Sequence, residues 1–424
     1  MTTGESLLAQ LKFLFEQDPL IDEVGLLFDI KQCDLSLENA FLLGNHKLGV
    51  AFEAGTILFQ AARTQFHSLN ALLQQELANN SMSEDSEHHA QLLHCTRAIL
   101  LISADFYTAW NTRKSFVARG WLDAQDEVQF TNLVFTLHPK SIDTWAYRRW
   151  LAARICASQL KDDVMIFHKQ QIEVCGRLAE QKPRNYHAWS FRHWIVSRLS
   201  HEMVCKELDE MENWCRMHVT DHSGWNHRQH TLNKLIKECL VSNEENLSWK
   251  LILAEYQFLS EIMTLYPTYE ALWCHRRFIM QHLLDKVARN NDNLNLAYLN
   301  DSVSRVAKNV LVASRDETIL SASWRKFLND CSNYTSTSAI STIIHEIGIA
   351  WTCNNQYSRR YGAWCMMRLR AFFHRKQELG EMTLQILLIR ELNSLGSFFQ
   401  KVLMEKDGMR QDLWRSTLNC NYIC

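Results

Sequence analysis

Glycine and proline are scarce in this sequence, with only 13 Gly and 4 Pro among 424 residues. These counts are about 3% and about 1% of the chain, against roughly 7% and 5% in an average soluble protein. Because β-sandwiches and β-barrels need both residues at their many turns, the composition excludes an all-β fold. The motifs G-x-G-x-x-G and G-x-x-x-x-G-K are missing too, which argues against a nucleotide-binding loop. Tryptophan is abundant, at 14 residues, and 47% of the chain is apolar, so the composition predicts a large α-helical core.

The sequence also lacks an excess of charge of either sign, a long apolar run and any C-x-x-C pair. With 45 Lys and Arg against 47 Asp and Glu, it offers no basic face for nucleic acid. No uninterrupted apolar stretch approaches the roughly 18 residues of a membrane span, and residues 1–30 have neither the basic start nor the apolar run of a secretory signal. We therefore expect a cytoplasmic protein whose 13 cysteines are reduced, with no transmembrane segment and no nucleic-acid partner.

The tryptophans form an internal repeat. Five of them have an arginine three residues later, whereas Lys and Arg together would occupy that position only once or twice by chance. The spacings between these tryptophans are 35, 44, 36 and 48 residues. The pairs are Trp110 and Arg113, Trp145 and Arg148, Trp189 and Arg192, Trp225 and Arg228, and Trp273 and Arg276.

A period of 35 to 50 residues without strand signals is the length of one helix pair. Four residues before three of the tryptophans stand Ser141, Asn185 and Asp221, which are side chains that cap helix N-termini. Three of the four prolines, Pro139, Pro183 and Pro267, lie just upstream, where a preceding helix must end. Each tryptophan should therefore lie about one turn into a helix.

These patterns predict an all-α fold, an α-α superhelix or crescent of stacked helical hairpins. We expect an N-terminal helical segment over 1–90 with a polar loop at 79–89, repeats over 91–375, and a C-terminal helical cap over 376–424. Two degenerate copies of the repeat are expected around Trp324 and Trp364.

The repeat resembles the α-subunit repeat of protein prenyltransferases over roughly residues 92–375. Asn185-Tyr-His-Ala-Trp-Ser-Phe-Arg192 is similar to the N-Y-x-x-W-x-x-R pattern of that family, and Pro139-Lys140 ahead of Trp145 resembles the copy before it. The layout is most similar to the type-3 geranylgeranyltransferase branch. From its size and layout we expect neither the extra domains of vertebrate Rab geranylgeranyltransferase α subunits nor the proline-rich leader of farnesyltransferase α subunits.

The resemblance implies a heterodimer in which this chain wraps an α/α-barrel β subunit of the Rab geranylgeranyltransferase type. The β subunit would hold the catalytic zinc and most of the isoprenoid pocket, so no cofactor is expected on this chain. The implied reaction transfers geranylgeranyl from its diphosphate to a C-terminal cysteine of protein substrates, including a Golgi SNARE.

The resemblance also implies site residues. Lys140 matches the lysine of the family that contacts the diphosphate, and a cation at a helix N-terminus can stabilise that leaving group. Arg184, Tyr186 and His187 match the segment that faces the active site and are expected to bind the diphosphate or the substrate. Ile142 stands where the family commonly has tyrosine, which alters the expected set of diphosphate contacts.

The recurring Trp and Arg residues are expected to be structural, because one active site would not need a copy in every repeat. His222, His227 and His230 cluster in one repeat but lack the further ligands of a familiar zinc set, so no metal is expected here. Two alternatives stay open: a helical-repeat scaffold without catalysis, and an α subunit of a Rab geranylgeranyl- or farnesyltransferase.

Overall fold

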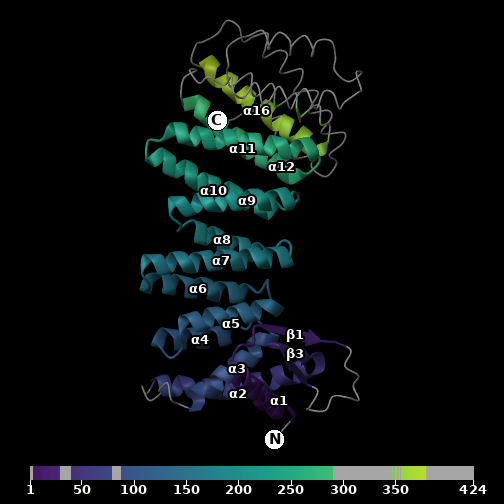
Figure 1. The fold of residues 1–424 in the computed structure, drawn as a ribbon, viewed down its shortest axis with the longest axis vertical. Coiled ribbons are helices and arrows are strands. Elements are labelled where there is room, and N and C mark those ends of the chain that lie inside the picture. The colour runs from purple at the N-terminus through teal and green to yellow at the C-terminus, as the bar shows by residue number, and fades with distance from the viewer. Residues whose placement is uncertain are drawn as a thin grey trace. The chain divides into compact units, whose positions relative to one another are not determined.

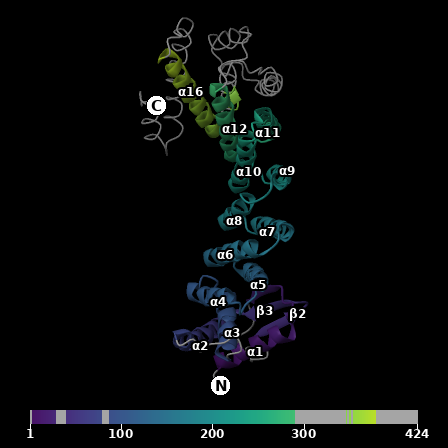
Figure 2. The same ribbon diagram turned by 90° about the vertical axis from the view of Figure 1, so that its left-hand side faces the viewer.

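The computed structural model describes residues 3–28, 40–78, 87–289, 346, 349–350, 353 and 355–378. The chain divides into two compact units, Met1–Leu199 and Ser200–Cys424, each of which is described by itself below. Helices dominate both units, so the prediction of an all-α fold built from stacked helical hairpins is confirmed (Figures 1 and 2). In the described part of the chain, no helix is long and apolar enough to cross a membrane.

The first unit begins with three helices, α1 (Thr3–Gln17), α2 (Phe52–Ala78) and α3 (Glu87–Ile102). Leu7, Leu8 and Leu11 are buried on α1, which packs on α2. Helix α3 starts within the polar loop predicted at 79–89, and its His89 is buried at 5% exposure. The predicted loop is therefore wrong for residues 87–89, while 79–86 lie outside the described residues.

A small sheet between α1 and α2 contradicts the prediction that residues 1–90 are helical. Its strands are β1 (Glu23–Leu27), β2 (Phe41–Gly44) and β3 (Lys47–Ala51), in the order β1-β3-β2. Strand β3 pairs parallel with β1 and antiparallel with β2, across a turn whose Asn45 and His46 both have positive φ. Apolar residues alternate along β3, which buries Leu48 and Val50 on one face. The reason for the error is the short length of these strands, which are too brief to interrupt a helical pattern read over longer windows.

The rest of the first unit is a series of hairpins formed by α4 (Tyr107–Arg119), α5 (Ala124–Leu137), α6 (Ile142–Ser158), α7 (Lys161–Gln181) and α8 (Tyr186–Val196). The repeat tryptophan is the fourth residue of α4, α6 and α8, one turn into each helix as predicted. The predicted caps are also confirmed. The Ser141 hydroxyl accepts a hydrogen bond from the Thr144 N–H, and the Asn185 amide oxygen accepts one from the Ala188 N–H.

The second unit continues the pattern with α9 (His201–Met217), α10 (His222–Val241), α11 (Glu245–Leu265), α12 (Glu270–Arg289) and α16 (Gln356–Glu378). Trp225 and Trp273 are again the fourth residues of their helices. Asp221 caps α10 by accepting from the Ser223 N–H.

The register of α16 differs from the prediction that Trp364 is a degenerate copy of the repeat tryptophan. Asn355 begins this helix as Asn185 begins α8, which puts Trp364 nine residues after the cap. Trp150 and Trp194 hold that position in α6 and α8, and like Trp364 each stacks on the aromatic residue three positions before it. The place of the repeat tryptophan is taken by Arg359. The predicted copy at Trp324, and residues 379–424 of the predicted cap, lie outside the described residues.

The repeat tryptophans are buried anchors. Each of four indole N–H groups donates to the backbone carbonyl six residues before it, at 2.7–3.0 Å; the acceptors are Ala104, Pro139, Val219 and Pro267. Two of these carbonyls accept a second hydrogen bond from an asparagine that begins a later helix. Asn185, at the start of α8, reaches Pro139 at 2.7 Å, and Asn355, at the start of α16, reaches Pro267 at 2.9 Å. The same carbonyl therefore fixes a tryptophan to its own turn and joins one repeat to the next.

The repeat arginines are buried and bonded to the neighbouring hairpin. Three of them form bidentate ion pairs with a buried glutamate, in which Nε and Nη2 each donate to one carboxylate oxygen. These pairs are Arg113 with Glu127, Arg228 with Glu255, and Arg276 with Glu346, at 2.5–2.8 Å. Each of the three carboxylates also bonds a Tyr or His at 2.6 Å, namely Tyr147, His275 and Tyr361.

Candidate functional site

Helices α4, α6 and α8 each have a repeat tryptophan as their fourth residue, and their starts lie side by side in the first unit. Helix α6 contacts both α4 and α8. Two hydrogen bonds join the starts directly: the Ser141 hydroxyl donates to Asp105 at 2.7 Å, and the Lys140 ammonium donates to the Pro183 carbonyl at 3.1 Å. The helix dipole makes such ends favourable for anions.

Lys140 is exposed and lies directly before the cap of α6. Its bond to the Pro183 carbonyl places the ammonium group beside the turn that begins α8, although 43 residues separate them in the sequence. A lysine ammonium has three N–H donors, so this bond leaves donors for a ligand. The structure thus brings Lys140 together with the segment that contains Arg184.

The segment from Arg184 to His187 presents three of its side chains and buries one. Arg184 is exposed and has φ 61°, a left-handed conformation that is uncommon for a residue other than glycine. Asn185 is fully buried, since it caps α8 and bonds Pro139. Tyr186 is 73% exposed, and its ring meets the half-buried His187 ring edge-on at 5.8 Å.

Exposed apolar side chains occupy the first residue of all three helices. Tyr107, Ile142 and Tyr186 are 64%, 62% and 73% exposed. Ile142 thus holds the same place as two tyrosines but offers no hydroxyl group. These three residues, together with Lys140 and Arg184, are called the helix-start surface below.

Two acidic residues at this surface, Asp105 and Asp143, were not predicted from the sequence as site residues. Asp105 accepts hydrogen bonds from the Ser141 hydroxyl and, at 3.3 Å, from the Asp143 N–H. Burial and the nearby Asp105 carboxylate raise the pKa of Asp143. Both acids add negative charge at the start of α6. The available signal was Asp143 in the first turn of a capped helix, where acidic residues are favourable.

Other candidate chemistry in the chain is structural. His227 is fully buried and bonds Glu207 at 2.6 Å, so it serves the core of its repeat. Within the described ranges, no group of His, Cys, Asp and Glu side chains could hold a metal ion. The Cys156 thiol lies 3.4 Å from His168 Nε2, but burial raises the pKa of Cys156 and lowers that of His168. That pair is therefore neutral at pH 7 and supplies no thiolate.

Comparison with known proteins fits the geometry of the repeats. The sequence model of the protein prenyltransferase alpha subunit repeat matches residues 124–155, 168–199, 204–235 and 252–283. The human protein prenyltransferase alpha subunit repeat-containing protein 1 is 30% identical over 338 residues, which cover 68% of this chain and 80% of that protein. The chain belongs to the protein prenyltransferase α-subunit repeat family.

Two further relatives extend the comparison. Protein prenyltransferase alpha subunit repeat-containing protein 1-A of Xenopus laevis is 30% identical over 62% of this chain and 69% of its own length. The rat geranylgeranyl transferase type-2 subunit alpha is 21% identical over 55% of this chain and 42% of its own length. Each family match begins in the first helix of a hairpin and ends within the second helix or, for 168–199, three residues after α8.

Proposed function

We propose that this chain is the α subunit of a heterodimeric protein geranylgeranyltransferase of the type-3 kind. In this proposal its partner is a β subunit of the Rab geranylgeranyltransferase type. The β subunit holds zinc and the isoprenoid, and this chain binds no cofactor. The complex acts in the cytoplasm and transfers geranylgeranyl from its diphosphate to a C-terminal cysteine of substrates such as a Golgi SNARE. Family membership and the distant similarity to a geranylgeranyl transferase α subunit support the proposal.

The observation that carries the proposal is the bond between Lys140 and the Pro183 carbonyl. It holds an ammonium group beside the turn that contains Arg184, at the starts of α6 and α8. In the proposed reaction, these cations stabilise the negative charge that gathers on the diphosphate as it leaves. Tyr186 and His187 supply hydrogen-bond donors beside them.

A second candidate function is a helical-repeat scaffold that binds partners without catalysis. Ile142 favours it, because this exposed position offers no hydroxyl to a diphosphate. Asp105 and Asp143 favour it too, since carboxylates at the start of α6 weaken the attraction of this helix end for an anion.

Co-expression of the full chain with a Rab geranylgeranyltransferase-type β subunit tests the proposal. The purified complex is supplied with geranylgeranyl diphosphate and a protein that ends in cysteines, and thioether product is measured by mass spectrometry. Farnesyl diphosphate in a parallel reaction tests the isoprenoid length. We expect geranylgeranylated product only when both chains are present. A stable complex that yields no product above background would favour the scaffold.

Identification of the β subunit that co-purifies with the chain from cells decides between branches of the family. A Rab geranylgeranyltransferase β subunit without further α subunits supports the type-3 assignment. A farnesyltransferase β subunit would contradict it.

A further inference from the structure

The buried arginine of α6 lacks the carboxylate that pairs with its counterparts in other repeats. Arg148 is fully buried, like Arg113, Arg228 and Arg276, but the residue that accepts from its Nε is Gln171, at 2.9 Å. A glutamine amide has a single oxygen, which here accepts from Nε, so Gln171 offers no second oxygen to Nη2 as a carboxylate would. The Tyr or His that bonds the carboxylate elsewhere is replaced by Phe191, which has no polar group.

One guanidinium nitrogen of Arg148 consequently has no acceptor. Nη1 donates to the Val128 carbonyl, Thr131 and Asn132, at 2.6–3.2 Å. Nη2 is buried and has no hydrogen-bond partner among the described residues. Burial lowers the pKa of Arg148 to about 10, so the group is still charged at pH 7. A buried cation with an unused donor is costly unless something supplies the missing acceptor.

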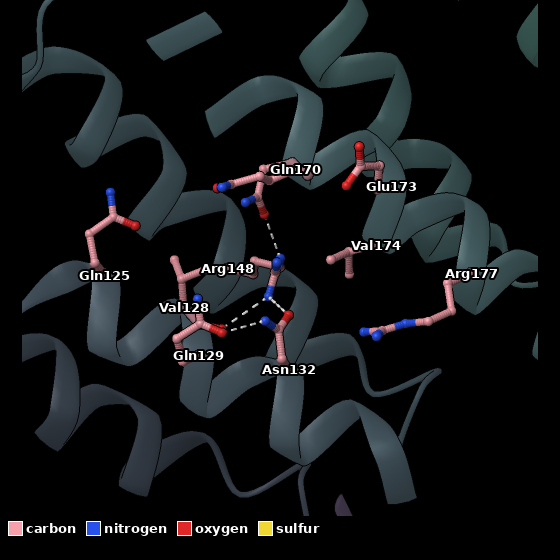
Figure 3. Close-up of a pocket in the computed structure, with 10 residues that line it drawn as sticks. Gln125, Val128, Gln129, Asn132, Arg148, Gln170, Glu173, Val174 and Arg177 are labelled. Carbon is pink, nitrogen blue, oxygen red and sulfur yellow. Dashed lines mark hydrogen bonds between the residues drawn. The ribbon is translucent and has the colours of Figure 1, made fainter. Parts of the chain in front are cut away.

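Arg148 is one of the residues that line a pocket of about 310 Å³ between α5 and α7. Figure 3 shows Arg148 between Asn132 of α5 and Gln170 of α7, with Glu173 and Arg177 farther along α7. The lining is mainly amide side chains, which can donate to an anion, and its two arginines outnumber its one carboxylate, Glu173. The exposed residues Gln170 and Glu173 at the rim leave the pocket open to solvent.

We propose that this pocket binds a small oxyanion, a phosphate or carboxylate group, whose oxygens accept from Arg148 Nη2 in place of the glutamate found in other repeats. The pocket volume suits a small molecule, at the low end of the range for ligand sites. Charge-assisted bonds to a guanidinium are strong and selective for phosphate and carboxylate. The proposal goes beyond the proposed transferase function and does not depend on it.

Titration calorimetry on the full chain without a β subunit tests the site, with inorganic phosphate and acetate as separate probes and chloride as the ionic-strength control. We expect saturable binding of phosphate, acetate or both, and the stronger probe identifies the group that the pocket prefers. Failure of both probes to bind more tightly than chloride would overturn the proposal.

The sharpest variant is Gln171→Glu, which rebuilds the pair seen at Arg113 and Glu127. We expect it to raise the melting temperature without phosphate and to lower the affinity of the bound probe by about tenfold or more, the value of a charge-assisted hydrogen bond. Asn132→Asp offers a carboxylate to Arg148 from α5 and should act in the same direction, which keeps the test open if Gln171→Glu misfolds.

The matched control is Gln181→Glu, which adds the same charge to an exposed position of α7 outside the pocket. It should leave the probe affinity unchanged. Equal loss of affinity in Gln181→Glu and Gln171→Glu would show that general charge repulsion is responsible and would overturn the assignment to Arg148. Wild-type affinity in both pocket variants would overturn it as well.

Discussion

Lys140 is the residue on which the proposed transfer reaction depends most directly. We expect Lys140→Ala to lower the single-turnover transfer rate of the complex about 10- to 100-fold, since a charge-assisted hydrogen bond to the leaving diphosphate contributes roughly 1.5–3 kcal/mol. The side chain is exposed and, within the described part of the chain, bonds the Pro183 carbonyl alone, so the fold should remain intact.

The control for this variant is Lys169→Ala, which removes an exposed lysine from the middle of α7. It should leave the rate at the wild-type value, while Lys140→Arg should restore part of it. An intact complex in which Lys140→Ala transfers as fast as wild type would rule out a catalytic role for Lys140.

Asn185 combines two functions that can be separated by substitution. Its amide oxygen caps α8, and its amide nitrogen donates to the Pro139 carbonyl of the preceding repeat. We expect Asn185→Asp to keep the cap yet to destabilise the protein by about 1–3 kcal/mol, because a carboxylate oxygen would face that carbonyl. Urea unfolding followed by tryptophan fluorescence measures the change. The reverse exchange at the exposed cap of α5, Asp123→Asn, should be nearly neutral, and equal effects at both sites would contradict the argument.

Sequence patterns reveal local roles of such residues better than their distant contacts. The caps of α6, α8 and α10 could be predicted because a capping side chain and the backbone N–H that donates to it lie within four residues. The bond from Asn185 to Pro139 spans 46 residues and depends on how consecutive repeats pack. Gln171 was missed for a related reason: its importance appears only when it is compared with glutamates at equivalent places in the fold.

At the scale of helices, Glu255 of α11 links α10 to α12. Burial alone would raise the pKa of Glu255, but hydrogen bonding from His275 and the charge of Arg228 outweigh it and lower the pKa from 4.5 to about 2. A lowered folded-state pKa means that the carboxylate stabilises the fold above about pH 4.5 and that this contribution is lost as the pH falls toward 2. We expect the loss to be about 3 kcal/mol in the free energy of unfolding, measured by urea titrations across this range.

Glu255→Gln provides the comparison for this pH dependence. The variant should be less stable at pH 7, since it leaves Arg228 without its carboxylate, and its stability should fall less between pH 5 and pH 2. An unchanged pH profile in Glu255→Gln would assign the acid sensitivity to other carboxylates.

At the scale of helices, the sequence patterns also gave a wrong prediction, namely the register of α16. Tryptophan marks the repeat in the sequence, but in α16 Trp364 stands five residues beyond the repeat position, which Arg359 holds. The bond from Asn355 to the Pro267 carbonyl, like that from Asn185 to Pro139, shows the true register. Strand β1 depends on a contact of the same distant kind, because the Val24 backbone bonds Thr136 of α5.

For the molecule as a whole, the proposed function requires association with a β subunit, and the helix-start surface is the proposed contact. We expect the double variant Tyr107→Glu, Tyr186→Glu to weaken that association at least about 100-fold, since two carboxylates would lose water at the interface without partners. Both side chains are largely exposed in the free chain, so circular dichroism and the melting temperature should stay close to wild type. Leu160→Glu is the matched control, because Leu160 is 78% exposed but follows the other end of α6, about 24 Å away along the helix. Binding is measured by surface plasmon resonance with immobilised β subunit. If the double variant binds as tightly as Leu160→Glu and wild type, the β subunit contacts a different surface of this chain.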